Sequence, residues 1–377
     1  MVAMPSNCCD VLIVGAGPAG LATAIALCQR GADVLLADSQ KPPIDKACGE
    51  GIMPDSRRDL AGIGVDLPAF CGAPFKGIRF CDEHASVAAD FPFGEGRGVR
   101  RTVLHRLLTD RATAAGVRLA WQTSVAIEPG HPIAIGGSPV KYKYLIGADG
   151  QSSRIRTWAG LDRGAVLTSR FGYRIHYRIP PWSSHVEVYW SSKGQAYVTP
   201  ISDNEVCCSV MTRFAGRTRS YEIVAGIPEL TQRLKGAEII TRERGAITTT
   251  RRLKCVTREN IALVGDASGS VDAVTGEGLA LGFRQALKLA DAISRDDLTL
   301  YENLHPTMMR LPQMMSRIML LMGRWPVLRR RALRTMADDP AIFQTLLGVH
   351  LGEKPLRQFL LQQGPGFGLR LLLPSLA

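Results

Sequence analysis

The sequence predicts an α/β fold with a Rossmann-like nucleotide-binding domain, an inserted substrate domain built on an antiparallel sheet, and a C-terminal helical region. Three observations predict it. Residues 10–38 follow the order strand, glycine-rich turn, Ala-rich helix and second strand, typical of a dinucleotide-binding unit. From about 167 to 250, β-branched and aromatic residues alternate with polar ones, which predicts an antiparallel sheet with one wet face. Beyond 300 the chain is Met-rich and basic, and we expect it to be helical.

The N-terminal motif is the most specific one. An apolar run over 11–14 predicts a buried parallel strand. The chain then turns at Gly15-x-Gly17-x-x-Gly20 and continues as a helix. Gly15 permits the tight turn, Gly17 lets the backbone approach a pyrophosphate, and Gly20 lets the helix pack on the strand. Asp38 ends the second strand, where we expect a carboxylate to bind a ribose hydroxyl. Because the helix N-terminus also offers free N–H groups to phosphates, the motif predicts an ADP-containing dinucleotide, either NAD or FAD.

The spacing of apolar residues predicts further helices and strands along the rest of the chain. Helices are expected over 56–60, 100–115, 220–235 and 279–293, and a hairpin over 77–93. Short strands are expected at 118–121, 124–127, 132–135, 144–146 and 261–264. We therefore assign 1–75, 95–166 and 255–300 to a discontinuous nucleotide-binding domain, 76–94 and 167–254 to a substrate-binding β-sheet domain, and 301–377 to the helical region.

Composition narrows the class of protein. A chain of 377 residues with 46% hydrophobic and 21% charged residues is ordinary for a folded globular protein. The net charge of +12 is spread along the chain with no aromatic-interleaved basic segment, so we expect no nucleic-acid partner. Nine cysteines without metal-type spacing predict reduced thiols in a cytoplasmic protein and no metal site. The sequence also contains no signal-peptide pattern and no apolar stretch long enough to span a bilayer.

Two further glycine-containing turns follow predicted strands, Gly147-Ala148-Asp149-Gly150 and Gly265-Asp266-Ala267. Together with the first motif and Arg101-x-x-Leu104, they resemble the flavoprotein superfamily of p-hydroxybenzoate hydroxylase. That group also contains the geranylgeranyl reductases and the flavin-dependent halogenases. The resemblance covers about 10–295 and implies FAD as the cofactor. From the residues alone, Asp149 and Asp266 could instead be helix N-caps, and Arg101 a surface charge.

By that resemblance, each motif holds one part of FAD. The first turn, including Pro18 and Ala19, cradles the pyrophosphate, and Asp38 holds the adenosine ribose. The remaining expected contacts are Arg101 with the phosphate and ribitol, Asp149 with the pyrophosphate, and Gly265 and Asp266 with the ribitol. The turn at Gly276, Gly278 and Leu279 presents N–H groups to the pyrimidine edge of the flavin. The loop with Cys48 and Gly49 lies near the ring.

The resemblance leaves three reactions open. The first choice is a monooxygenase that hydroxylates an aromatic or polyketide-like molecule through a flavin C4a-hydroperoxide, with NAD(P)H as a transient reductant. The alternative is a reductase of C=C bonds in a lipid-like substrate, as in geranylgeranyl reductases; Lys46-Ala47-Cys48-Gly49 and Thr275-Gly276-Glu277-Gly278 favour it. A flavin-dependent halogenase is the third choice, because both tryptophans of its motif are absent from 195–200.

Cys48, Glu50 and Tyr197 are the candidate catalytic residues. Cys48 is either a proton donor near the flavin or a small packed side chain. Glu50 could instead cap the helix that begins after Pro54, and Tyr197 could belong to the core of the sheet rather than to a substrate pocket.

The Met-rich basic region beyond 300 suggests two partners: a small-molecule substrate that is lipid-like, and an anionic membrane surface contacted from one side. An ordinary helical cap on the FAD domain explains the same composition. The sequence therefore predicts a cytoplasmic protein that is either free or peripheral to the membrane, and it leaves the oligomeric state open.

Overall fold

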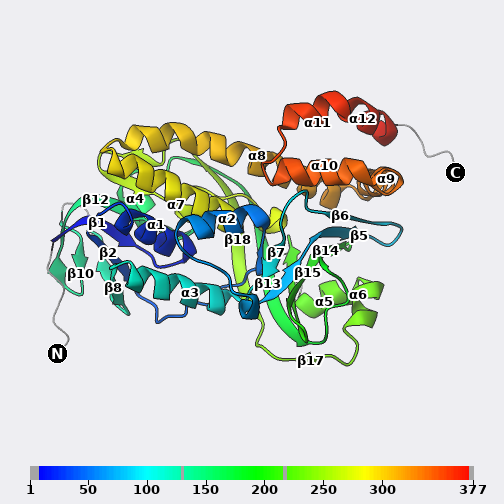
Figure 1. Cartoon of the computed structure of the whole chain (residues 1–377), viewed down its shortest axis with the longest axis horizontal. Coiled ribbons are helices and arrows are strands. Elements are labelled where there is room, and N and C mark those ends of the chain that lie inside the picture. The colour runs from blue at the N-terminus through cyan, green and yellow to red at the C-terminus, as the bar shows by residue number, and fades with distance from the viewer. Residues whose placement is uncertain (1–7, 129–130, 215–218, 373–377) are drawn as a thin grey trace.

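The computed structural model describes residues 8–128, 131–214 and 219–372. Its first layer is a six-stranded sheet in the order β19-β20-β12-β1-β2-β8, in which every neighbouring pair is parallel except β19 with β20. Figure 1 shows this sheet at the end of the molecule that holds the N-terminus. The strands are β1 (Cys8–Val14), β2 (Val34–Asp38), β8 (Arg118–Trp121), β12 (Lys141–Gly147), β19 (Thr257–Arg258) and β20 (Ile261–Leu263). The parallel strands predicted at 11–14, 33–37, 118–121, 144–146 and 261–264 are confirmed.

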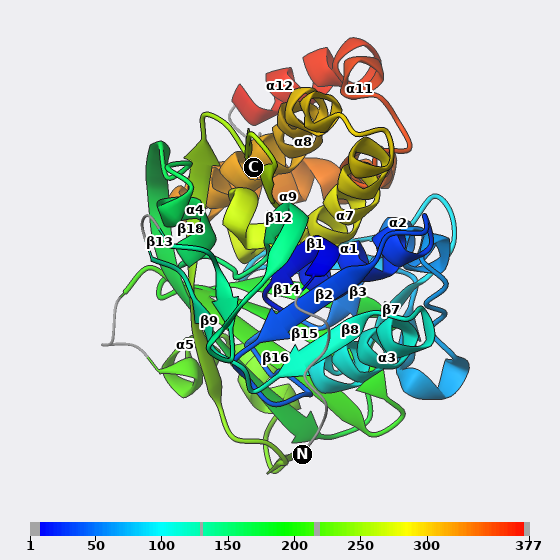
Figure 2. The same ribbon diagram turned by 90° about the vertical axis from the view of Figure 1, so that its left-hand side faces the viewer.

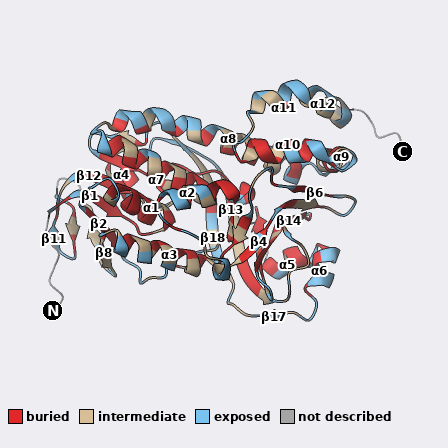
Figure 3. Ribbon diagram, viewed as in Figure 1, coloured by how far each residue is buried: buried red, intermediate tan, exposed pale blue. Residues whose placement is uncertain are grey.

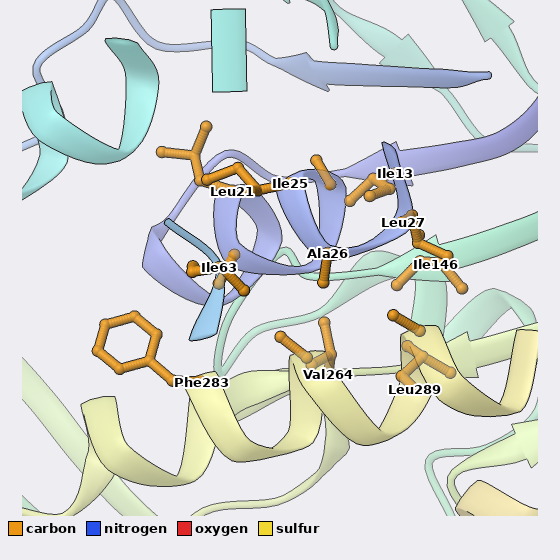
Figure 4. Packing of buried hydrophobic residues seen from close by; sticks show 14 of the residues in the cluster. Ile13, Leu21, Ile25, Ala26, Leu27, Ile63, Ile146, Val264, Phe283 and Leu289 are labelled. Atoms are coloured by element: carbon orange, nitrogen blue, oxygen red, sulfur yellow. The ribbon is translucent and has the colours of Figure 1, made fainter. Parts of the chain in front are cut away.

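Helices cover one face of this sheet and bury its apolar residues. They are α1 (Pro18–Cys28), α2 (Pro54–Gly62), α3 (Arg101–Ala114) and α7 (Gly278–Ser294). Figure 4 shows α1 above α7, with Ile25 and Leu27 toward the strand residues Ile13 and Ile146, and Phe283 and Leu289 of α7 belong to the same buried cluster. The other face packs against α4 (Arg154–Trp158) and a small sheet of β9 (Val125–Ala126), β10 (Ala134–Ile135) and β11 (Ser138–Pro139). This core holds the strand ends that carry the glycine motifs.

The second layer is an eight-stranded sheet in the order β17-β13-β16-β15-β14-β5-β6, with β18 also paired to β13. Its strands are β5 (Gly77–Cys81), β6 (Ser86–Asp90), β13 (Gly164–Arg178), β14 (His185–Trp190), β15 (Gln195–Ser202), β16 (Glu205–Thr212), β17 (Glu238–Ile239) and β18 (Arg244–Leu253). All pairs are antiparallel except β14 with β5. The hairpin predicted over 77–93 is confirmed as β5 and β6, and it joins this sheet beside a strand that follows it by about a hundred residues.

The predicted wet face of this sheet is wrong for its central strands. Figure 3 shows them buried, because α9 (Pro326–Asp338) and α10 (Pro340–His350) cover one face near β5 and β6 while α5 (Ser220–Ala225) and α6 (Pro228–Arg233) cover the other. The polar residues of the alternating pattern lie inside and find partners there. Glu187 is an example, since its carboxylate accepts hydrogen bonds from Arg79 at 3.0 Å and from Trp182 at 2.7 Å.

The single helix predicted over 220–235 is also wrong. The chain forms two short helices, because Gly226 ends α5 and Pro228, which lacks an N–H group, begins α6. A third sheet of β3 (Gly51–Ile52), β7 (Gly96–Gly98) and β4 (Ala73–Phe75) lies between the two layers, and a short 3-10 turn, η1, covers Ala69–Cys71.

The C-terminal region is helical, as predicted. Helix α8 (Leu298–Arg324) packs on α7 and then continues toward the second sheet, where α9 (Pro326–Asp338), α10 (Pro340–His350), α11 (Leu356–Gln362) and α12 (Gly364–Leu372) follow. Figures 1 and 2 show α9–α12 stacked above β5, β6 and β14. The helices therefore cover the eight-stranded sheet as well as the nucleotide-binding sheet. We call the eight-stranded sheet the substrate sheet, after the substrate-binding domain predicted from the sequence. Among the described residues, no helix is both long and apolar enough to cross a membrane.

Candidate active site: a dinucleotide groove joined to an apolar compartment

A single cavity of about 1380 Å³ runs from the carboxyl ends of β1, β2, β12 and β20 to the C-terminal helices. Pockets for one small ligand measure roughly 300–1,000 Å³, so this cavity has room for a dinucleotide and a second molecule. Its polar end lies where β1 separates β2 from β12, the place at which open parallel sheets bind ligands.

The glycines of the first motif have the geometry that the sequence predicts. Gly15 has a φ of +105°, and a Cβ there would lie 2.4 Å from the carbonyl oxygen of Ala148. A Cβ at Gly20 would lie 2.0 Å from the oxygen of Gly15, so only glycine allows α1 to approach the strand end. A Cβ at Gly17 would meet nothing within 4 Å and would extend into the cavity instead. Gly17 caps α1 without a side-chain acceptor, which leaves the helix N-terminus open to an anion.

Asp38 is held in place at the end of β2. One carboxylate oxygen accepts the N–H of Ala16 at 2.8 Å, and the other accepts the N–H of Gln40 at 2.8 Å. The carboxylate also lines the cavity, and each oxygen has a second lone pair for a hydroxyl. Asp38 is therefore preorganised to accept hydrogen bonds from a ribose.

Arg101 and Asp149 each keep one buried polar atom without a hydrogen-bond partner. These atoms are Nε of Arg101 and Oδ1 of Asp149, and both side chains line the cavity. The other oxygen of Asp149 accepts the N–H groups of Arg154 at 2.7 Å and Ile155 at 3.2 Å in the first turn of α4, but the N-cap of α4 is Ser153, so the alternative of Asp149 as an N-cap is wrong. Unpaired buried polar atoms that face a cavity indicate a missing polar ligand.

The late motifs close the same end of the cavity. Gly265 and Asp266 form a 3-10 turn, η2 (Gly265–Ser268), and Asp266 contacts the ammonium of Lys46 at 3.3 Å. A second 3-10 turn, η3 (Ala273–Thr275), ends at Gly276, whose φ of +71° favours glycine. Gly276, Gly278 and Leu279 line the cavity at the start of α7, which has no side-chain cap. The sequence motifs thus converge on one groove, and its donors, orphaned atoms and open glycines fit FAD.

Cys48, Gly49 and Glu50 belong to the loop before β3, and their environments differ. Cys48 is half-buried, lines the cavity, and accepts the N–H of Glu50 at 3.4 Å through its sulfur. Gly49 also lines the cavity. Glu50 has a left-handed φ of +61°, and its side chain points into a buried cluster with the substrate sheet.

Both oxygens of Glu50 are occupied in that cluster. Oε1 accepts from Nη1 of Arg174 at 2.7 Å and from the N–H of Arg101 at 2.9 Å, and Oε2 lies 2.6 Å from Nε2 of His176. Burial alone would raise the pKa of Glu50, but His176, the Arg101 N–H and Arg174 together hold that pKa below its usual range. An ionised carboxylate with all of these partners is a poor proton donor. The geometry favours a positioning role for Glu50 over the catalytic one.

The same cluster brings three groups with ligand atoms close together, since Glu50, His176 and Cys207 lie within 4.8 Å of one another. The Arg174 cation already contacts Glu50, and burial raises the pKa of the Cys207 thiol well above its ordinary value. That thiol donates to the carbonyl oxygen of Cys48 at 3.8 Å. The arrangement therefore ties the Cys48 loop to the sheet.

Tyr197 lies on β15 and lines the cavity, and its hydroxyl donates to the carbonyl oxygen of Val274 at 3.0 Å. Burial raises the pKa of Tyr197 above its ordinary value, so the phenol keeps its proton. Cys48, Glu50 and Tyr197 all line the cavity, but both carboxylate oxygens of Glu50 are held by Arg174 and His176.

The far end of the cavity is apolar, and sequence reasoning did not predict its wall. Strands β5, β14 and β16 contribute Ile78, Phe80, Val186, Val188 and Val210. The C-terminal helices contribute most of the rest: Met315, Ile318, Met319, Leu321, Met322, Leu328, Ala332, Met336, Phe343, Leu346, Leu347, Phe359, Phe367 and Leu371. We call this end the apolar compartment. The signal in the sequence was the Met-rich composition, because flexible methionines suit a binding surface that adapts to its ligand.

The fold and the groove define an FAD-dependent oxidoreductase of the p-hydroxybenzoate hydroxylase-like superfamily. The family described as FAD binding domain matches residues 8–295, and the chain belongs to it. Among curated proteins, the menaquinone reductase of Mycolicibacterium smegmatis is 25% identical over 346 residues, which is 80% of each chain. The digeranylgeranylglycerophospholipid reductase of Methanosarcina acetivorans is 24% identical over 327 residues, 77% of each chain. A flavoprotein/dehydrogenase structure from Cytophaga hutchinsonii superposes with a TM-score of 0.79 at 18% identity, covering 96% of this chain and 98% of that one.

Proposed function

We propose that this protein is an FAD-dependent reductase of C=C bonds in an isoprenoid, lipid-like substrate. The observation that carries the proposal is the apolar compartment, which continues from the FAD groove. The C-terminal residues that line it include no Asp, Glu, Lys or Arg, and their one ionisable side chain is His350. An extended hydrocarbon chain fits such walls, because each buried CH₂ group contributes about 0.8 kcal/mol. The relatives named as menaquinone and digeranylgeranylglycerophospholipid reductases support the same class of substrate.

Bound FAD in its reduced form would supply a hydride, with NAD(P)H as its proposed source of electrons. The protein's own residues bind, orient and exclude water. Asp38, Arg101, Asp149 and Asp266 would hold the dinucleotide, and the helix N-terminus at Gly278 would face the edge of the flavin that becomes anionic on reduction. The apolar walls would hold a double bond beside the ring and keep water away from it.

Hydroxylation of an aromatic or polyketide-like molecule is the second candidate. The observation in its favour is the same dry compartment, which such a reaction also needs. Halogenation is a weaker candidate, because residues 195–200 contain neither tryptophan of the halogenase motif.

One experiment separates these reactions. The FAD-loaded protein is reduced and incubated, with and without air, with a prenylated quinone or a geranylgeranylated phospholipid, and with an aromatic polyketide. A product that gains two hydrogens without air supports the reductase. A product that gains one oxygen, formed only in air, supports the monooxygenase and refutes the reductase.

We further propose that the protein contacts an anionic membrane through the corner between α8 and α9. Arg324, Trp325 and Val327 are exposed there, with Trp325 at 54% and Val327 at 57% exposure. Leu321 and Ile318, about one and two turns earlier on α8, are exposed and also line the apolar compartment. A corner that combines cationic and exposed apolar side chains suits a bilayer surface with anionic lipids, and it would bring the compartment close to lipid.

A further inference from the structure

His350 is the one imidazole among the described residues that line the cavity, and it lies at the junction of the two ends. On α10, Phe343, Leu346, Leu347 and His350 all line the cavity. Their spacing of three, four and seven residues places them on one face of the helix. The helix therefore presents an apolar stripe to the substrate end and finishes that stripe with a titratable ring.

The second half of the junction is Glu277, which lies between the cavity-lining glycines Gly276 and Gly278 at the start of α7. Its side chain is only 7% exposed, and Oε2 has no hydrogen-bond partner. That atom lies 3.8 Å from Nδ1 of His350. A contact of this length can tighten when substrate binds, and the pair would then be close enough to exchange a proton.

Reduction of a double bond needs a proton as well as a hydride, and the other candidates near the groove are poorly placed to give one. Glu50 is ionised in its buried cluster, and the hydroxyl of Tyr197 already donates to the Val274 carbonyl. We propose that His350 donates this proton to the substrate and that Glu277, behind it, orients the ring and returns a proton to it. The proposal rests on the proposed reductase function.

The proposed step balances as follows. The C=C π bond breaks, and one carbon forms a C–H bond with a hydride whose electron pair comes from reduced FAD. The other carbon forms a C–H bond with the proton from Nε2 of His350, whose N–H bond breaks, while Nδ1 accepts the proton of the Glu277 carboxyl. The ring is neutral before and after the step, and water reprotonates the Glu277 carboxylate that remains. Reduced nicotinamide is the electron donor that returns the oxidised FAD to its reduced form.

The surroundings of Glu277 favour the protonated form of its carboxyl, since they raise its pKa above the ordinary value. Burial raises the pKa of Glu277, with a further increase from Asp55 on α2, and His350 and Arg284 oppose that shift. On the same side, Arg284 contacts Asp55 at 3.0 Å, and burial raises the pKa of Asp59 to about 6. The charged groups facing Glu277 therefore come from α2, α7 and α10.

The test compares His350→Gln, Glu277→Gln and the exposed control His131→Gln in the FAD-loaded protein, with a prenylated quinone as substrate. We expect kcat to fall roughly 100-fold for His350→Gln, the usual size of a general-acid contribution, and roughly tenfold for Glu277→Gln, with KM within about twofold. Added imidazole should restore part of the activity of His350→Ala. Neither substitution should change the visible spectrum or the stoichiometry of bound FAD.

A second measurement is independent of turnover. A carboxyl whose folded pKa is raised stabilises the fold below its unfolded pKa, and that contribution is lost as pH rises through the folded pKa. Glu277→Gln should therefore be more thermostable than the wild type at pH 8, with the difference disappearing toward pH 4. A purely structural role for Glu277 predicts the opposite, a loss of thermostability at pH 8.

The outcomes are distinguishable. If the wild type reduces the quinone and both variants do so at the same rate, the proposed role of His350 and Glu277 is overturned. The proposed reductase function is then unaffected. Wild-type protein that reduces none of the C=C substrates overturns both proposals. If His350→Gln does not fold, Glu277→Gln and the imidazole-treated His350→Ala decide the question.

Discussion

The buried carboxylate of Glu50 should stabilise the protein in a way that depends on pH. Replacing it with glutamine keeps the shape of the side chain and removes its charge. Glu50 joins the Cys48 loop to the substrate sheet through Arg174 and His176, across 124 and 126 residues of sequence. Its left-handed φ of +61° costs roughly 1 kcal/mol or more, a strain that the cluster offsets.

The expected loss in the free energy of unfolding depends on which partners Arg174 keeps when Glu50 is replaced. Removing one member of a buried ion pair typically costs about 3–5 kcal/mol. Arg174 would keep Asp45, whose Oδ2 lies 2.9 Å from Nη2, so the guanidinium is not left unpaired. We therefore expect Glu50→Gln to lower the free energy of unfolding by about 3 kcal/mol at pH 7. The matched control is Glu238→Gln. Its pair with Arg178 measures 2.8 Å but is exposed, and we expect a change below about 0.5 kcal/mol.

The stability difference between wild type and Glu50→Gln should become smaller as the pH falls. Because the folded pKa of Glu50 lies below its unfolded value of about 4.3, its stabilising contribution is present above that value and is lost as pH falls through the folded pKa. Urea unfolding of the FAD-free protein, followed by tryptophan fluorescence, should show the gap between wild type and Glu50→Gln at pH 7 and its closure toward pH 3. An equal gap at both pH values, or a gap at pH 7 no larger than that of Glu238→Gln, would refute the reasoning.

Three further predictions follow from the cavity and its rim. Gly17→Ala should weaken FAD binding about tenfold, measured by fluorescence quenching, without loss of stability, whereas Gly20→Ala should destabilise the fold because its Cβ meets backbone. Met319→Trp should fill part of the apolar compartment, so turnover of a long prenyl substrate should fall more than that of a short one; equal losses would contradict this placement. Trp325→Ser should reduce co-sedimentation with anionic liposomes roughly tenfold, about 1.4 kcal/mol, while Tyr221→Ser, at a more exposed aromatic residue, should not.

The sequence predicts the nucleotide-binding half well because its signals are local. An apolar strand, three glycines and a terminal acid lie within 30 residues, and the backbone of Gly15 and Gly20 admits no other residue. The same holds for the hairpin and for most helices, whose periodicity follows from burial on one face. The prediction from local signals was wrong where it ignored a helix-breaking residue. Pro228 is the example, since it divides the predicted helix into two.

The polar interior could not be predicted in the same way. The alternation of polar residues in the substrate sheet indicated a wet face, yet Glu187 is 1% exposed because Arg79, from a strand more than a hundred residues away, pairs with it. Glu50 looked like a free acid near the flavin for the same reason, since its partners Arg174 and His176 are remote in sequence. Burial of a charge becomes visible only when the partner that compensates it is placed beside it.

The FAD groove lies within the residues that match the family, whereas much of the apolar compartment lies outside them. For this reason the cofactor follows from the family, and the reaction is a proposal. The family match ends at residue 295, and it contains the groups that fit FAD. Much of the apolar compartment is built by helices that begin after this point, from Met315 to Leu371. The chemistry available to reduced FAD is common to many proteins of this fold. What reaches the flavin would be decided by the compartment, which His350 lines with the buried Glu277 behind it. The specificity of this protein should therefore change with substitutions in α8–α12 that leave FAD binding unaltered.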